Sequence, residues 1–156
     1  MGKRVLVAVD MHSVSEASIL YGIELAARTD SSLALIAVSF STSLEKSSVS
    51  ETPGQDAWMD RAVSESQERS VSLEIFVTSG RFFEEVTRFV RSQPAVQFIV
   101  MAGPKDRKGK GNSKFATALK CLHEEFEGEI LLVEKAGQIT RVRDLYLQSS
   151  TREISV

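Results

Sequence analysis

The feature that most constrains this chain is a series of short, nearly uninterrupted apolar runs. Such runs are typical of strands that are buried on both faces, as in parallel sheets. Five of them follow one another along the 156 residues: Val5 to Val9, Leu33 to Phe40, Leu73 to Val77, Val96 to Met101 and Ile130 to Val133.

Between these runs, apolar residues recur at helical spacing. The positions that indicate helices are Ile19 to Ala27, about Gln55 to Glu68, Phe82 to Val90, and Phe115 to Phe126. Strands and helices therefore alternate, and right-handed crossovers would place helices on both faces of one sheet. We predict an α/β fold with an open five-stranded parallel sheet of order 3-2-1-4-5 and two helices on each face, as in flavodoxin-like folds.

Local signals place several boundaries. Ser13 with Glu16 three residues later predicts a capping box at the start of the first helix. Ser41 to Gly54 is rich in Ser and Thr and is expected to form a loop. We expect one domain over residues 1–134 and a C-terminal tail over residues 135–156. In that tail, the spacing predicts one face of a short helix formed by Ile139, Val142, Leu145 and Tyr146.

Composition narrows the class of protein. The net charge of -2 gives no case for nucleic-acid binding, and the single cysteine, Cys121, excludes an internal disulfide. The first apolar run is too short for a signal peptide or a membrane span. We therefore expect a cytoplasmic protein that is not inserted in a membrane.

The motifs of common enzymes are missing from the sequence. The loop after Val9 has none of the glycines of a dinucleotide-binding turn, and Gly109-Lys110 is not followed by Ser or Thr. His12 and His123 have no spacing that suits a metal, and no serine lies in a nucleophile elbow. Cys121 falls inside a predicted helix and is expected to be a buried, inert thiol. These patterns predict no catalytic residue and no metal site.

A ligand site is expected at the carboxyl ends of the central strands. In open parallel sheets, ligands bind where the connections change direction, which lies between the first and fourth strands for the predicted order. Asp10 ends the first strand, and Ala102 and Gly103 end the fourth. The glycine- and lysine-rich stretch "MAGPKDRKGKGNSKFAT", from Met101 to Thr117, therefore lies beside Asp10.

At this point the sequence resembles the universal stress protein family. The resemblance is carried by "KRVLVAVDMHSVSEASILYGIELAARTDSSLALIAVSF" from Lys3, by "SGRFFEEVTRFV", by "FIVMAGP" and by "ILLVE", and it covers Lys3 to about Glu134. It implies the fold predicted above, in its adenine nucleotide alpha hydrolase-like form. It also implies that Asp10 contacts a nucleoside and that Val38 lines an adenine pocket.

The phosphate loop of the ATP-binding members is only partly present. In the register that the resemblance implies, Gly103, Asp106, Ala116 and Thr117 stand where the family has Gly, Gly, Gly and a hydroxyl. Aspartate at position 106 adds bulk and negative charge. Around it, the basic side chains of Lys105, Arg107 and Lys108 either neutralise a bound anion or form a solvated loop.

Two functions therefore stay open. The first is a non-enzymatic stress-response or regulatory protein that acts through partner contacts, with weak or absent ATP binding and no cofactor. The second binds ATP with Mg²⁺, using the basic loop in place of the missing glycines. The nucleotide-binding candidates are Asp10, Val38, Gly103, Lys105, Arg107, Lys108 and Thr117.

The expected assembly is a homodimer. The fifth strand would be an apolar edge, which favours pairing with another strand. The resemblance implies the same, so the predicted interface is the antiparallel pairing of Ile130, Leu131, Leu132 and Val133 across a two-fold axis. The tail is expected to dock either on the second copy or on a separate protein, and by resemblance alone the cytoplasmic part of a membrane transporter is a candidate for that partner.

Overall fold

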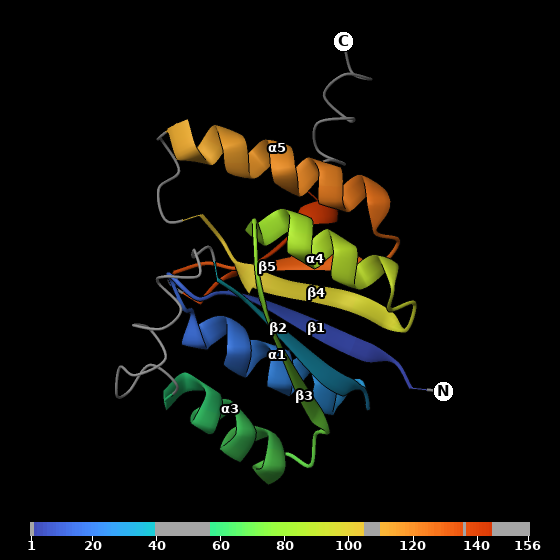
Figure 1. Cartoon of the computed structure of the whole chain (residues 1–156). Coiled ribbons are helices and arrows are strands. Elements are labelled where there is room, and N and C mark those ends of the chain that lie inside the picture. The colour runs from blue at the N-terminus through green and yellow to red at the C-terminus, as the bar shows by residue number, and fades with distance from the viewer. Residues whose placement is uncertain (1, 40–56, 105–109, 136, 145–156) are drawn as a thin grey trace.

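The computed structural model describes residues 2–39, 57–104, 110–135 and 137–144. One sheet of order β3-β2-β1-β4-β5-β6 runs through the molecule (Figure 1). Its first five strands in this order are parallel, and β6 is antiparallel to β5. The strands are β1 Arg4–Asp10, β2 Ser32–Ser39, β3 Leu73–Ser79, β4 Val96–Ala102, β5 Glu129–Val133 and β6 Ile139–Arg141. The predicted fold class and strand order are confirmed.

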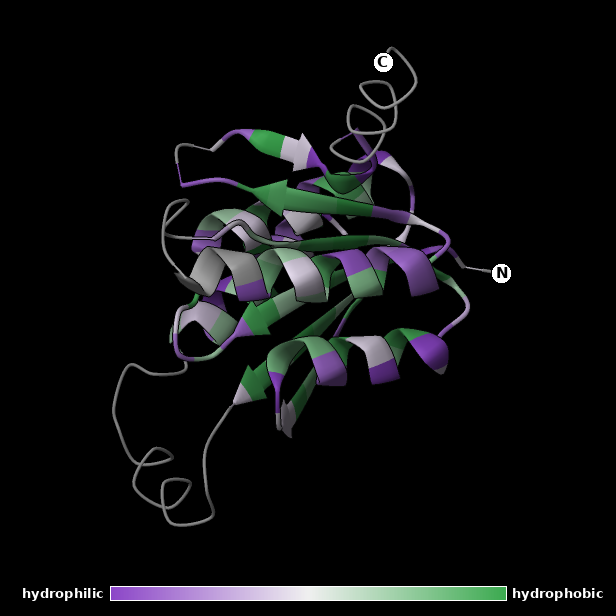
Figure 2. Ribbon diagram, turned by 90° about the horizontal axis from the view of Figure 1, so that it is seen from above, coloured by the Kyte–Doolittle hydropathy of each residue, from purple (hydrophilic) through white to green (hydrophobic). Residues whose placement is uncertain are grey.

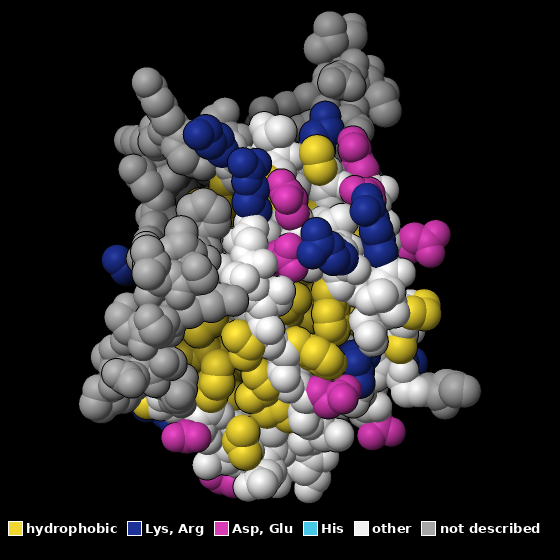
Figure 3. All heavy atoms as spheres, viewed as in Figure 1, with side chains coloured by type: hydrophobic (Ala, Val, Ile, Leu, Met, Phe, Trp, Pro, Cys, Tyr) yellow, Lys and Arg dark blue, Asp and Glu magenta, His cyan; other side chains and the backbone are white. Residues whose placement is uncertain are grey.

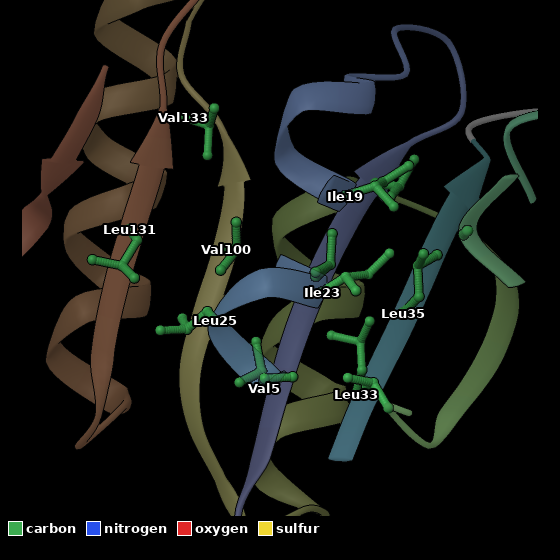
Figure 4. Packing of buried hydrophobic residues seen from close by; sticks show 14 of the residues in the cluster. Val5, Ile19, Ile23, Leu25, Leu33, Leu35, Val100, Leu131 and Val133 are labelled. Carbon is green, nitrogen blue, oxygen red and sulfur yellow. The ribbon is translucent and has the colours of Figure 1, made fainter. Parts of the chain in front are cut away.

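Helices cover both faces of the sheet, as predicted. The helices α1 (Glu16–Arg28) and α3 (Ala57–Glu68) lie on one face, and α4 (Phe82–Arg91) and α5 (Lys110–Glu125) lie on the other (Figure 1). The helices cover the sheet because its strands are apolar. Figure 2 shows mainly hydrophobic residues along the strands and a mixture of hydrophilic and hydrophobic residues along the helices. In β1, Val5 and Val7 pack toward α1 and Leu6 packs toward α4 and α5. Figure 4 shows the α1 side of this core.

The start of α1 differs from the predicted capping box. Ser15, and not Ser13, caps the helix: its Oγ accepts a hydrogen bond from the Ser18 backbone N at 3.2 Å and another from the Ser18 hydroxyl at 2.9 Å. Ser13 instead belongs to the turn after β1, where its backbone N donates to the Asp10 carbonyl at 2.9 Å. Glu16 pairs with Arg61 of α3 at 2.6 Å and is therefore not turned back toward Ser13.

The expectation of an open edge at β5 is wrong, because β6 occupies that edge. The chain turns back after β5, with the Gly137 N donating to the Glu134 carbonyl at 2.8 Å and the Glu134 N donating to the Gln138 carbonyl at 2.7 Å. The short helix predicted in the tail is wrong at Ile139, which lies in β6 opposite Val133. Val142 follows β6 and is fully buried, which holds this hairpin against the core.

The structure also tests the prediction for Cys121, whereas the predicted Ser/Thr-rich loop falls outside the described residues. Cys121 is exposed on α5, so the prediction of a buried thiol is wrong; Leu119 and Leu122 take the buried side of that helix. The predicted loop Ser41 to Gly54 lies outside the described residues, as do Leu145 and Tyr146. Within the described part of the chain, no helix is long and apolar enough to cross a membrane.

Candidate functional site

A cavity of about 300 Å³ opens at the carboxyl ends of β1 and β4, where the sheet connections change direction. This is the place at which ligands bind in open parallel sheets. Its described lining comes from the ends of both strands, the turn after β1 and the N-terminal parts of three helices: Ala8, Val9, Asp10, Ser13, Ser15, Ser18, Phe82, Phe83, Ala102, Gly103, Pro104 and Phe115.

Asp10 and Gly103 both line this cavity, as the sequence predicted for neighbours at the switch point. The Asp10 side chain is held by one bond, in which its Oδ1 accepts from the His12 backbone N at 2.9 Å. Gly103 is anchored through its backbone N, which donates to the Val133 carbonyl at 3.0 Å. The carboxylate of Asp10 is therefore positioned by the turn that follows β1.

Three phenylalanines form the opposite wall. Phe82 and Phe83 lie in the first turn of α4, and their ring centroids are 5.2 Å apart at an interplanar angle of 90°. Phe115 of α5 lies 5.4 Å from Phe83 at 79°, so each pair meets edge to face. In the sequence, Phe82 and Phe115 were among the apolar positions that indicated two helices, and neither was predicted to line a site. All three are partly buried and also pack against the core on this side of the sheet, so no sequence signal distinguished them from ordinary core residues.

A second carboxylate borders the site at Gly103. A Cβ atom added to Gly103 would lie 2.8 Å from Oε1 and 3.1 Å from Oε2 of Glu134. The missing side chain of Gly103 thus leaves room for the Glu134 carboxylate, which is also held by a hydrogen bond from the Thr140 hydroxyl to Oε2 at 3.2 Å. Glu134 was not among the site residues predicted from the sequence. Its place follows from the register, in which Val133 pairs with Ala102 and the next residues of both strands come together.

No family model and no curated protein sequence matches the chain. Solved structures do match it. A universal stress protein in complex with cAMP superposes with a TM-score of 0.60 at 13% identity, over 85% of this chain and 97% of the other. Universal stress proteins from Archaeoglobus fulgidus (TM-score 0.56, 11% identity, 83% and 96% covered) and Burkholderia pseudomallei (0.54, 19%, 84% and 95%) are similar.

This chain has the fold of the universal stress proteins. That fold is confirmed over most of the chain, as the resemblance implied. Two other nucleotide-binding candidates, Val38 and Thr117, are not among the residues that line the cavity. Val38 is 2% exposed in the core and does not line the cavity, although its carbonyl accepts from the Met11 backbone N at 3.0 Å. Thr117 is exposed on α5 and does not line the cavity either.

The charge around the site is therefore negative in the part of the chain that the structure describes. Asp10 lines the cavity and Glu134 lies against Gly103, and none of the lining residues is Lys or Arg. Lys105, Arg107 and Lys108 lie outside the described residues, as does Asp106. Among the described residues, no three His, Cys, Asp or Glu side chains are grouped to hold a metal ion.

Proposed function

We propose that this protein is a non-enzymatic regulator of the universal stress protein type, which acts through partner contacts and binds ATP weakly or not at all. The observation that carries the proposal is the Glu134 carboxylate against Gly103. Gly103 is the first glycine of the phosphate pattern in the register given above. The face of Gly103 that a phosphate would approach is next to a negative charge.

The expected cost can be estimated from Coulomb's law. Like charges about 4 Å apart repel by about 1 kcal/mol in water and by about 4 kcal/mol at an effective dielectric constant near 20. Each 1.4 kcal/mol is about a tenfold change in affinity, so this contact weakens triphosphate binding by a factor between a few and about a thousand. Among the described residues that line the cavity, none is a Lys or Arg that would offset the repulsion.

The polar groups of the cavity also support a binding role over a catalytic one. The hydroxyls of Ser15 and Ser18 are used by the helix cap, and Ser18 is only 1% exposed. Neither histidine is among the described residues that line the cavity, where the hydroxyl of Ser13 shares the lining with the carboxylate of Asp10. The described lining therefore contains no serine–histidine pair of the kind that activates a nucleophile.

Titration calorimetry with two ligands tests the proposal. ATP with Mg²⁺ is expected to bind more weakly than about 10 μM, which corresponds to roughly -7 kcal/mol. Adenosine carries no phosphate, so we expect it to bind no more weakly than ATP. If ATP binds tighter than about 10 μM and more than tenfold tighter than adenosine, the proposal is wrong. The alternative, in which Lys105, Arg107 and Lys108 hold the phosphates, would then be correct.

A further inference from the structure

The strand β3 forms the second edge of the sheet, opposite to β6. Within residues 2–39, 57–104, 110–135 and 137–144, only β2 pairs with it. Its seven residues pair with β2 in one continuous register, without a bulge, and contain neither Pro nor Lys. Edge strands are usually protected by a bulge, a Pro or a Lys, because an unprotected edge pairs with other strands. The strand β3 has none of these three features.

The side chains of β3 are mainly apolar on the α1 face, with Leu73, Ile75 and Val77, and the α4 face carries Phe76 between Glu74 and Thr78. Val77 is 61% exposed, the highest value among the large hydrophobic residues of the described chain. Figure 3, in which β3 lies at the front as in Figure 1, shows hydrophobic side chains gathered on both sides of this strand. Its one charged residue, Glu74, is paired with Arg4 of β1. The edge therefore combines free backbone groups with apolar side chains and little free charge.

The hydrogen bonds to β2 show which backbone groups of β3 are free. The Leu33 N donates to the Ser72 carbonyl at 2.8 Å, and the Gly80 N donates to the Ser39 carbonyl at 2.9 Å. Because successive residues of a strand direct their N–H and C=O groups to opposite sides, the even-numbered residues face β2. The N–H and C=O groups of Leu73, Ile75, Val77 and Ser79 consequently point away from the sheet.

We propose that two copies of this chain pair antiparallel through β3, about a two-fold axis at Phe76. Full overlap of Leu73–Ser79 with its copy places Ile75 opposite Val77 and Leu73 opposite Ser79. Each of these pairs joins two residues whose free groups point outward, which is the hydrogen-bonded geometry of an antiparallel ladder. Pairing over the whole length of β3 thus also gives its outward-pointing N–H and C=O groups hydrogen-bond partners in the second copy.

The side chains agree with this register on both faces. On the α1 side, Ile75 meets Val77 of the second copy, and both are apolar. On the α4 side, Phe76 meets its own copy in the close, non-hydrogen-bonded position, and Phe89 lies 5.0 Å from its ring. Glu74 meets Thr78, so no like charges face each other. A second copy therefore covers Ile75 and Val77 on one face and Phe76 on the other at once, which favours it over an unrelated peptide.

Sedimentation velocity of the full chain tests the assembly. We expect the wild type at tens of micromolar to have twice the chain mass of 17.2 kDa. Val77→Lys places two charges in the interface and should raise the dimer dissociation constant at least about tenfold. Ile139→Lys is the matched control on the opposite edge, where Ile139 is 37% exposed, and should leave the dimer unchanged. A monomeric wild type, or a dimer that Ile139→Lys weakens and Val77→Lys does not, would overturn the proposal.

A cysteine cross-link tests the register. Only the residue on the axis faces its own copy, at a Cα separation that suits a disulfide. In a Cys121→Ser background, Phe76→Cys should therefore form a covalent dimer when it is oxidised with diamide. Thr78→Cys, two residues along on the same face, should not. Equal cross-linking of both variants would exclude the axis at Phe76.

Discussion

Replacing Glu134 with glutamine should strengthen the binding of ATP. The substitution keeps the size of the side chain and removes its negative charge. The amide oxygen still accepts the hydrogen bond that the Thr140 hydroxyl donates at 3.2 Å, so the hairpin after β5 keeps its contact. The change is therefore directed at the charge beside Gly103 and leaves the packing in place.

The size of the effect follows from the position of the carboxylate. Its Oε1 lies 2.8 Å from the place where a Cβ of Gly103 would stand. A phosphate that contacts the backbone of Gly103 would come within about 4 Å of this charge. At that distance the repulsion amounts to about 1 kcal/mol in water and about 4 kcal/mol at a dielectric constant near 20. Because the cavity is open to solvent and Asp10 is exposed, we expect the lower part of that range. Glu134→Gln should then tighten ATP binding by about 5-fold to 30-fold.

Titration calorimetry with ATP and Mg²⁺ measures this change, and a second variant controls for it. Glu129→Gln removes a carboxylate from the other end of β5, where Glu129 lies 3.6 Å from the Arg141 Nε, and should leave ATP binding unchanged. Adenosine binding should be the same in both variants and the wild type, because adenosine has no phosphate to repel. If Glu134→Gln folds normally and binds ATP no better than the wild type, the carboxylate is not what opposes phosphate binding at Gly103.

Three further substitutions or reactions test the local structure. Gly22→Ala should lower the free energy of unfolding, measured in urea titrations, by about 2 kcal/mol, because the new Cβ would collide with Val7 Cγ2 of β1. This loss is expected even though alanine favours helices more than glycine does. An unchanged free energy of unfolding would mean that α1 can move away from β1. Ser15→Ala should cost about 1 kcal/mol in the same assay, while Ser13→Ala should cost less, since only Ser15 caps the helix. Cys121 should react with a thiol reagent in the folded protein at the rate of an exposed cysteine, and reaction only after unfolding would contradict its exposure.

The strands were predictable because their signal is local. A run such as Val5 to Val9 is apolar because the strand is covered on both faces, and it matches β1, Arg4–Asp10, to within one residue at each end. The helix α5 was harder: its apolar spacing begins at Phe115, whereas the helix begins at Lys110. Its first turn is rich in glycine and lysine, so neither composition nor periodicity marked it as helical.

The site was predictable only where it depends on strand ends. Asp10 and Gly103 follow apolar runs, and the predicted strand order brings those ends together. Glu134 also follows an apolar run, but its contact with Gly103 depends on the pairing of Ala102 with Val133, which no local pattern reveals. Strand β6 has only three residues and polar neighbours, so its pairing with β5 depends on the turn before it.

The hairpin after β5 connects the two main departures from what the resemblance implied. By pairing with β5, β6 occupies the backbone edge that a dimer through Ile130 to Val133 would need. The same turn holds the backbone of Glu134 through Gln138 and its side chain through Thr140. A chain that folds back at this point therefore closes one edge of the sheet and also places the Glu134 carboxylate against Gly103, where the resemblance implies a phosphate. The other edge, β3, is the one left for assembly, and it lies at the far side of the sheet from Glu134. Val77→Lys should for this reason change the assembly without changing ATP affinity, whereas Glu134→Gln should change ATP affinity without changing the assembly.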